Sequence, residues 1–355
     1  EMLRSLVGSE MCIRDRCFGL LLFLSIVIGC KQNSQNIVEK IPLKCNIIDD
    51  DYLFGNPSLI AVSDSFLVVV DMSQDSLIHV FKLPDCNYIG KCGIMGQGPN
   101  EFTMISSLFD YKDNEFGIYD PNKKEIDLLN VSGSNLKLSL HTSLDNTYLH
   151  YDVRPVSEKC FIGTGIYEKG RFCILDNTGK MKGLYGQWPA RDKQEAETNN
   201  RIKAQAYMGG FAVSPSGKKM IAYTMTADMI ELYDFSGDSI RKITDLYKSY
   251  PDYNYKTGSE SFTGTSKKTP FCYLYATCTD KYIYVLYSGK NFQEHSTNAM
   301  NGNIIYVYDW NGDNLCQYEL DMNLQNICID KTGKILYAIA YNPDPAIVKI
   351  LLPNH

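Results

Sequence analysis

The stretch Ala61-Val-Ser-Asp-Ser-Phe-Leu-Val-Val-Val-Asp71 consists of an apolar strand, a short polar turn and a second apolar strand. The same pattern returns in residues 109–120, 211–223 and 327–337, so it follows a period of about 45–60 residues. A period of this length indicates one supersecondary unit stacked several times, and four strands per unit indicate a β-propeller. The sequence therefore predicts an all-β fold, a six-bladed β-propeller with four antiparallel strands per blade.

The number of blades follows from the strand count. Apolar segments form five complete sets of four strands and a last set of only three before the chain ends. We expect a strand within residues 37–48 to complete the last blade, which closes the ring and removes a free sheet edge. The expected blades span residues 57–92, 104–140, 149–185, 209–243, 271–320 and 324–351.

The connections between strands predict two different faces. Short turns rich in Gly, Asn, Asp and Ser join the first strand of a blade to the second, and the third to the fourth. These turns share one face, called here the short-turn face, and the long insertions share the other, the loop-rich face. Extra loop length accumulates where a binding surface is built on a rigid scaffold, so the loop-rich face is the predicted binding surface. The insertions are residues 93–103, 187–208, 248–270 and 288–302.

The N-terminal segment predicts export. Residues 18–29 form an apolar run that is too short to span a bilayer but is typical of the core of a signal peptide. The run ends in Val27-Ile28-Gly29-Cys30, which resembles a bacterial lipobox with Cys30 as the lipidated residue; an ordinary signal peptide is the alternative. The expected divisions are 1–16, which resembles a translated sequencing adapter, 17–30 as lipoprotein signal peptide, 31–36 as polar tether and 37–355 as one propeller domain.

Lipidation of Cys30 would make a membrane the first partner of the protein. Lipoproteins of the Bacteroidetes that reach the cell surface resemble one another in an acidic cluster just after the cysteine, and residues 31–36 contain none. We therefore expect an anchor in the outer membrane, with the periplasmic leaflet favoured over the cell surface.

The composition excludes some classes of partner and cofactor. The net charge of −6 and the absence of a long basic run argue against nucleic acid. Nine cysteines follow Cys30, an odd number, and whether any of them form disulfides is left open. No spacing of Cys and His typical of a metal site occurs, so neither a metal nor another cofactor is expected.

Gly96-Gln-Gly-Pro-Asn-Glu-Phe102 lies between the first two blades. Together with the lipobox and the six-blade pattern it resembles the G-x-G-P-x-E-F phrase of BF3164-like (TolB-like) propeller lipoproteins of Bacteroidetes, and more distantly NHL-type propellers. This resemblance covers essentially the whole mature chain and implies an exported six-bladed propeller. We expect Gly96, Gly98 and Pro99 to shape the turn, Glu101 to cap backbone amides and Phe102 to pack inward.

Aromatic and basic residues of two insertions are the candidate ligand contacts. Residues 191–206 are compatible with one amphipathic helix on the channel rim, which would carry Trp188, Arg201 and Tyr207, and the Tyr-rich segment 247–255 adds Tyr250 and Tyr253. Aromatic rings stack on sugars and peptide side chains, and arginine binds carboxylates. The alternative is a solvated helix that only caps blade four.

No catalytic residue is predicted, because the five histidines share no spacing with a nucleophile or a carboxylate pair. The predicted function is a lipid-anchored, non-enzymatic binding or scaffolding module that holds a protein, peptide or glycan on the loop-rich face. The alternative is an envelope hydrolase or lyase in the central channel, which clustered His and acidic residues would favour. A purely structural envelope protein would show a featureless rim.

Overall fold

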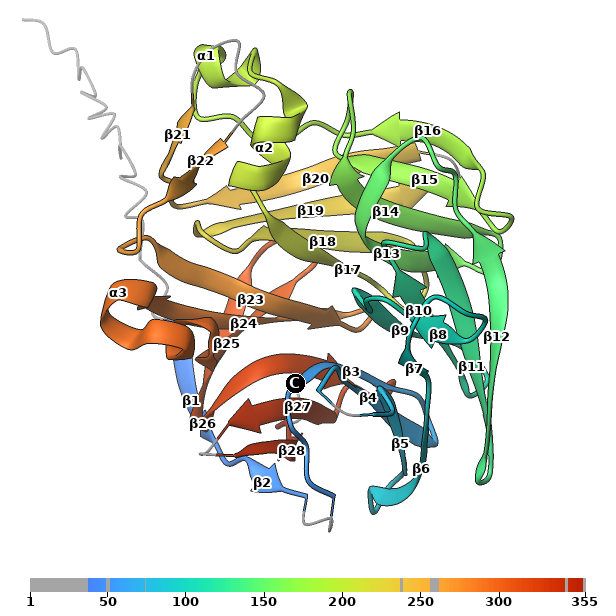
Figure 1. Ribbon diagram of the computed structural model, residues 1–355. Coiled ribbons are helices and arrows are strands. Elements are labelled where there is room, and N and C mark those ends of the chain that lie inside the picture. The colour runs from blue at the N-terminus through green and yellow to red at the C-terminus, as the bar shows by residue number, and fades with distance from the viewer. Residues whose placement is uncertain are drawn as a thin grey trace, which may run out of the picture. The chain divides into compact units, whose positions relative to one another are not determined.

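Six blades, each with its own inner strand, surround one axis in the computed structural model of the chain (Figure 1). The structure describes residues 38–48, 52–73, 75–236, 239–255, 262–341 and 344–353, so the predicted leader, Cys30 and the tether lie outside the described residues. Val38–His355 form one compact unit. Its innermost strands touch in the cyclic order β3 (Pro57–Val62), β9 (Ser107–Lys112), β13 (Leu149–Ser157), β17 (Gly209–Val213), β23 (Pro270–Cys278), β26 (Asn314–Ile329) and back to β3. The predicted ring of six blades is confirmed.

Blades one to four are separate antiparallel sheets whose strands step outward from the axis in chain order. Their bounds lie within a few residues of those predicted, because each strand is a run of apolar residues that ends at a turn signal. After the inner strand they continue with β4 (Phe66–Asp71), β5 (Ile78–Lys82), β6 (Asn87–Cys92); β10 (Glu115–Asp120), β11 (Glu125–Ser132), β12 (Asn135–Ser143); β14 (Cys160–Ile166), β15 (Phe172–Asp176), β16 (Met181–Tyr185); and β18 (Lys219–Thr224), β19 (Met229–Ser236), β20 (Ser239–Tyr247).

Blades five and six share one continuous strand. The first part of β26 pairs with β25 (Gly302–Asp309) as the outer strand of blade five, and the part from Leu324 pairs with β27 (Ile335–Tyr341) as the inner strand of blade six. Blade five also contains β24 (Tyr282–Asn291), and blade six contains β28 (Pro345–Leu351). The two blades therefore form a single eight-stranded sheet rather than two separate ones.

Two short N-terminal strands close the ring, and each of them pairs with a different blade. The short strand β2 (Asn46–Ile47) pairs antiparallel with β28 and completes blade six. In contrast to the expected single closing strand, β1 (Glu39–Leu43) runs parallel to β26 and adds a fifth strand to blade five. The Cys45 amide donates to Asp321 Oδ1 at 2.8 Å between these two pairings. The edge that blade five would otherwise expose is thereby covered.

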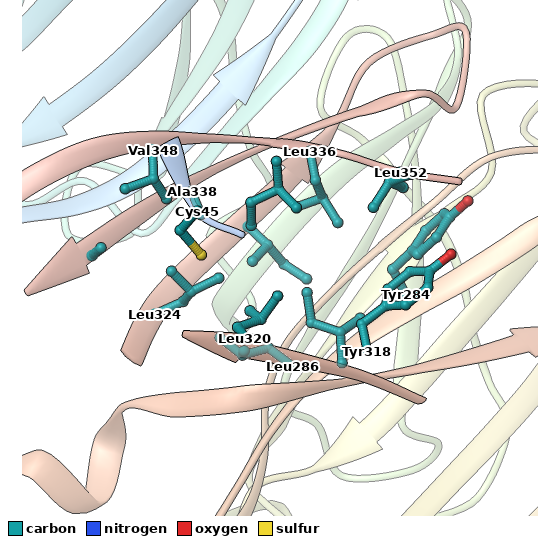
Figure 2. Close-up of a cluster of buried hydrophobic side chains, with 14 of the residues drawn as sticks. Cys45, Tyr284, Leu286, Tyr318, Leu320, Leu324, Leu336, Ala338, Val348 and Leu352 are labelled. Atoms are coloured by element: carbon teal, nitrogen blue, oxygen red, sulfur yellow. The ribbon is translucent and has the colours of Figure 1, made fainter. Parts of the chain in front are cut away.

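A large apolar cluster packs between blades five and six (Figure 2). Leu286 and Tyr318 from blade five meet Leu336 and Val348 from blade six, and Cys45 of the N-terminal segment lies among them. Burial of this kind is the main stabilising term of the fold. All nine cysteines of the described part of the chain are free thiols, and eight of them are buried.

The insertions carry short elements of their own. Helices α1 (Lys193–Ala196) and α2 (Asn200–Ala206), strands β21 (Tyr253–Tyr255) and β22 (Phe262–Thr265), and α3 (Phe292–His295) with the 3-10 helix η1 (Ser296–Met300) gather along one side in Figure 1. The first insertion contains β7 (Ile94–Met95) and β8 (Glu101–Phe102), which pair in parallel. Within the described residues no helix is long and apolar enough to cross a membrane.

The same hydrogen-bonding pattern recurs in several short turns. The side chain of Asp176, Asp309 or Asp330 accepts hydrogen bonds from backbone amides two to five residues later. A glycine three residues after each aspartate adopts a positive φ, as does Gly217 after Ser214. Some of these turns also pack on a neighbouring blade, since a Cβ on Gly217 would lie 1.8 Å from the Val156 carbonyl oxygen.

Gly217→Ala and Gly133→Ala should therefore differ in cost. Both glycines have φ near +60 to +70°, but nothing lies within 4 Å of a Cβ built on Gly133. Gly133→Ala should lower the free energy of unfolding by about 1–2 kcal/mol, the cost of a left-handed alanine. Gly217→Ala should lose at least about 1 kcal/mol more, because the backbone of blade three must shift. Urea denaturation measures both, and equal losses would show that the turn does not pack tightly on blade three.

Two histidines are buried as neutral side chains. His79 Nε2 lies 3.1 Å from the Tyr52 hydroxyl, and His150 Nδ1 lies 2.7 Å from the Tyr167 hydroxyl. Burial lowers the pKa of each imidazole to about 4. Between pH 6.5 and 4 the unfolded chain therefore binds a proton at each position and the folded chain does not, so their contribution to stability is lost as the pH falls.

His150→Gln and His79→Gln should flatten this dependence. The difference in unfolding free energy between the wild type and each variant should shrink by up to about 3 kcal/mol from pH 6.5 to 4. The wild type and each variant are compared at every pH because the buried Asp127 carboxyl also titrates in this range. Burial raises its pKa to about 6, so its own contribution to the free energy of unfolding increases as the pH falls. This contribution is the same in both proteins and cancels in the difference. The exposed His295→Gln serves as control. A difference that stays constant with pH would mean that the buried imidazoles become protonated without cost.

Candidate functional site

The glycine-rich phrase of the first insertion forms a compact turn between blades one and two. Glu101 Oε2 accepts a hydrogen bond from the Gly98 amide at 2.8 Å, and a Cβ on Gly96 would overlap the same carboxylate. Phe102 is fully buried in the core between the two blades. Lys123 Nζ donates to the carbonyl oxygens of Gly98 and Glu101. These contacts give the phrase a structural role and leave no cradle for a phosphate.

Two buried carboxylates position loops of the loop-rich face. The sequence analysis did not single them out. Asp71 and Asp120 end the second strands of blades one and two and are fully buried. Asp71 accepts from the amides of Gly55, Asn56 and Ser73, and Asp120 accepts from those of Thr103, Met104, Asn122 and Lys123. The sequence does contain a signal for these two residues, since an Asp ends the second strand in both copies of the repeated pattern.

The second and third insertions share a core built around Glu195. This carboxylate is fully buried and accepts hydrogen bonds from the hydroxyls of Tyr207 and Tyr253, the first at 2.8 Å. Arg191 pairs with it at 3.3 Å and lies over the Tyr253 ring. Two of the predicted ligand contacts, Tyr207 and Tyr253, are therefore held inside the loop assembly by a residue that the sequence analysis did not identify.

Trp188 is also buried, and its indole lies over the guanidinium of Arg171, 4.8 Å from the ring centroid. Arg171 forms a buried ion pair with Glu231 that joins blade three to blade four. A guanidinium over an indole face is a favourable arrangement when both are removed from water. In this arrangement the buried Trp188 ring covers the ion pair.

The two remaining candidates, Arg201 and Tyr250, lie exposed on the loop-rich face. The single helix expected over residues 191–206 is two short helices. Asp192 caps α1 by accepting from the Glu195 amide at 2.8 Å, and Asn199 caps α2 by accepting from the Arg201 amide at 2.8 Å. A second capping residue inside the segment starts a new helix, so the predicted amphipathic face is interrupted.

Exposed apolar side chains are concentrated on the loop-rich face. Six of the fifteen large exposed hydrophobic residues lie inside the four insertions, and two more lie at the loop-rich ends of β9 and β13. Among the described residues the turns of the short-turn face contribute none, and three lie at the short-turn ends of strands: Tyr88 on β6, Leu315 on β26 and Leu351 on β28. The eight on the loop-rich face are called here the apolar rim: Ile94, Met95, Met104, Leu149, Met208, Tyr250, Phe292 and Met300.

A cavity of about 520 Å³ lies in the central channel and opens on the opposite side, at the short-turn face. Its wall is built by the C-terminal halves of all six inner strands and by the turns that follow them. The sequence analysis placed the predicted binding surface on the loop-rich face. This cavity therefore lies at the other end of the channel from the predicted binding surface.

Arg154 crosses the channel at the inner part of this cavity. It starts on β13 of blade three, and its Nη2 donates to the Tyr275 hydroxyl of blade five at 3.2 Å. Its Nη1 donates to the Leu108 carbonyl of blade two at 2.6 Å, and its Nε lies 3.0 Å from Asp152 Oδ1. Burial alone would lower the pKa of Arg154, but Asp152 and Tyr275 raise it above its usual value, so the guanidinium stays charged.

Ion pairs between turns surround the mouth of the cavity. Lys331 of blade six lies 3.4 Å from Asp64 of blade one and 3.3 Å from Asp110 of blade two. Lys112 of blade two pairs with Glu158 of blade three at 3.2 Å. Except for Asp64, these residues line the cavity, and no histidine is among its lining residues. The mouth thus carries both signs of charge above walls that are largely apolar.

Among the described residues, no group of three or more His, Cys, Asp and Glu side chains is arranged to hold a metal ion. Burial raises the pKa of the Cys173 and Cys272 thiols to about 12, which keeps them protonated and unreactive at neutral pH.

Comparison with known proteins agrees with the fold. A solved structure from Bacteroides fragilis NCTC 9343, described as that of an exported protein, superposes with a TM-score of 0.55 at 14% identity and covers 89% of this chain and 99% of its own. A luciferin-regenerating enzyme superposes with a TM-score of 0.51 at 11% identity and covers 87% and 95%. No curated protein matches the chain. The family model described as TolB-like 6-blade propeller-like matches residues 36–332, and the chain therefore belongs to the TolB-like six-bladed propeller family.

Proposed function

We propose that this chain is an exported, lipid-anchored propeller that binds a protein partner through its loop-rich face without catalysing a reaction. The observation that carries the proposal is the apolar rim. Large apolar side chains that stay exposed together on one face of a soluble domain mark interaction surfaces. Four of the eight are methionines, whose flexible side chains adapt to irregular partner surfaces.

A protein suits this surface better than a glycan. Sugar binding by stacking requires exposed aromatic faces, and Trp188, Tyr207 and Tyr253 use theirs inside the loop assembly. Tyr250 and Phe292 are the two aromatic side chains of the rim, and each is 40% exposed. Methionine, aromatic residues and arginine are enriched in protein interfaces, and Arg201 is exposed in the second insertion of the same face.

The proposed anchor limits the distance between the propeller and the membrane. Strand β1 begins opposite Cys316, near the end of blade five where the short turns lie. From Cys30 to Val38 the chain can span no more than about 29 Å. A lipid on Cys30 would therefore keep the start of β1 within about that distance of the membrane.

A photo-crosslinking amino acid placed at Met208 or Phe292 should give a discrete protein adduct in cells, because these positions lie on the proposed docking face. The same amino acid at Ile243 or Leu140, which are similarly exposed on outer strands, should give none. Adducts are detected by electrophoresis and identified by mass spectrometry. Equal adducts from both sets, or none from the rim, would argue against docking through this face.

Cys30→Ser should release the protein from the membrane fraction, because the thioether that carries the lipid cannot form on serine. Fractionation and metabolic labelling with an alkyne fatty acid measure the change. Cys45→Ser, which leaves the lipobox intact, is the matched control. Retention of the Cys30→Ser protein in the membrane with unchanged labelling would exclude Cys30 as the anchor.

A further inference from the structure

The cavity at the short-turn face is independent of the proposed docking face, and its chemistry defines a ligand. Asp110 is the central group. One carboxylate oxygen lies 3.3 Å from Lys331 Nζ, and the other, Oδ1, is buried and has no hydrogen-bond partner among the described residues. A buried carboxylate oxygen without a donor is costly. The Asp110 side chain as a whole is 25% exposed, so a ligand can approach the carboxylate at Oδ2, in competition with Lys331, and a carboxylate prefers a cationic donor.

The same mouth also holds cations that can move. The side chains of Lys331 and Lys112 are 46% and 48% exposed, and each is held only by partly exposed acidic partners. Exposed pairs of this kind are worth about 0–1 kcal/mol, so a ligand carboxylate can replace one partner at little cost. The site can therefore accept an ammonium and a carboxylate at once.

The wall below the mouth favours an apolar body between these charges. Ile60, Val156, Phe211 and Ile327 are among its lining residues. Four aromatic residues are among those that line it: Phe109 and Phe211 are buried, Tyr111 is stacked on Phe161 with centroids 6.0 Å apart, and the Tyr275 hydroxyl accepts from Arg154. The apolar part of this wall fits the side chain of a peptide better than the hydroxyls of a sugar.

The volume sets the size of the ligand. A cavity of about 520 Å³ equals the space of roughly 17 water molecules, at about 30 Å³ each. This suits a molecule with a similar number of non-hydrogen atoms and lies within the usual range of small-ligand sites. Larger chains would have to extend out of the mouth.

We propose that the channel mouth binds short zwitterionic peptides of about two to three residues, with the peptide ammonium on Asp110 and the carboxylate on Lys331 or Lys112. The apolar part of the wall receives the side chain between them. This site would add a soluble small-molecule ligand to the protein partner proposed above, on the opposite face.

Isothermal titration calorimetry of the propeller, residues 38–355, tests the proposal with alanyl-phenylalanine. The dipeptide should bind with a Kd below about 1 mM. N-acetylation, which removes the ammonium, and C-terminal amidation, which removes the carboxylate, should each weaken binding at least tenfold. Asp110→Asn should weaken binding of the free dipeptide by a similar factor and abolish the effect of acetylation. Lys331→Met should abolish or reduce the effect of amidation.

Asp85→Asn is the matched control, because it makes the same charge change in an exposed turn of the same face outside the cavity. It should leave the Kd unchanged. Equal binding of the free and acetylated dipeptides, tighter binding of maltose than of the dipeptide, or no heat of binding at 10-fold higher concentrations would each overturn the proposal. Because the modified peptides are tested on the wild type, the result does not depend on the folding of a variant.

Discussion

The seam between blades six and one is the constraint on which the rest of the structure depends. Asn326 Nδ2 of the last inner strand donates to the Ser58 carbonyl of the first at 3.0 Å, and the Tyr341 hydroxyl donates to the Asn56 side chain at 3.2 Å. Lys331 and Asp64 add an ion pair at the short-turn end. A propeller left open at this seam would expose two sheet edges and lose the fixed distance between opposite blades. The cavity wall and the positions of the insertions both require that distance.

Ring closure also explains why the two faces differ. Inner strands converge on the axis, so their turns lie close together at the short-turn face, where side chains from three blades meet at Lys331. Charged residues there form ion pairs with residues of neighbouring blades. The insertions of the loop-rich face stand further out and fold on themselves, as the Glu195 core shows. Their outer surfaces therefore keep the apolar side chains of the rim exposed.

The strands and short turns could be predicted because each is encoded locally, by an apolar run that ends in Asp, Asn, Ser or Gly. The candidate site could be predicted only in part. Whether Trp188 and Tyr207 face a ligand or the loop interior depends on Glu195, and nothing in the sequence distinguishes that buried carboxylate from its exposed neighbours. Asp110 and Arg154 occupy equivalent positions near the ends of two inner strands, but their meeting in one cavity follows from ring closure, which a linear pattern does not show.

The charged groups at the channel mouth can exchange ion-pair partners when a ligand binds there. Burial raises the pKa of the Asp110 carboxyl, while Lys331 lowers it, so the group is held between two opposing effects. An arriving ammonium replaces the lysine and leaves the charge on Asp110 as well compensated as before. The displaced Lys331 still has Asp64 within reach, and a ligand carboxylate can join it. Binding then conserves the number of ion pairs, so the free energy gained comes from packing of the ligand body against the cavity wall.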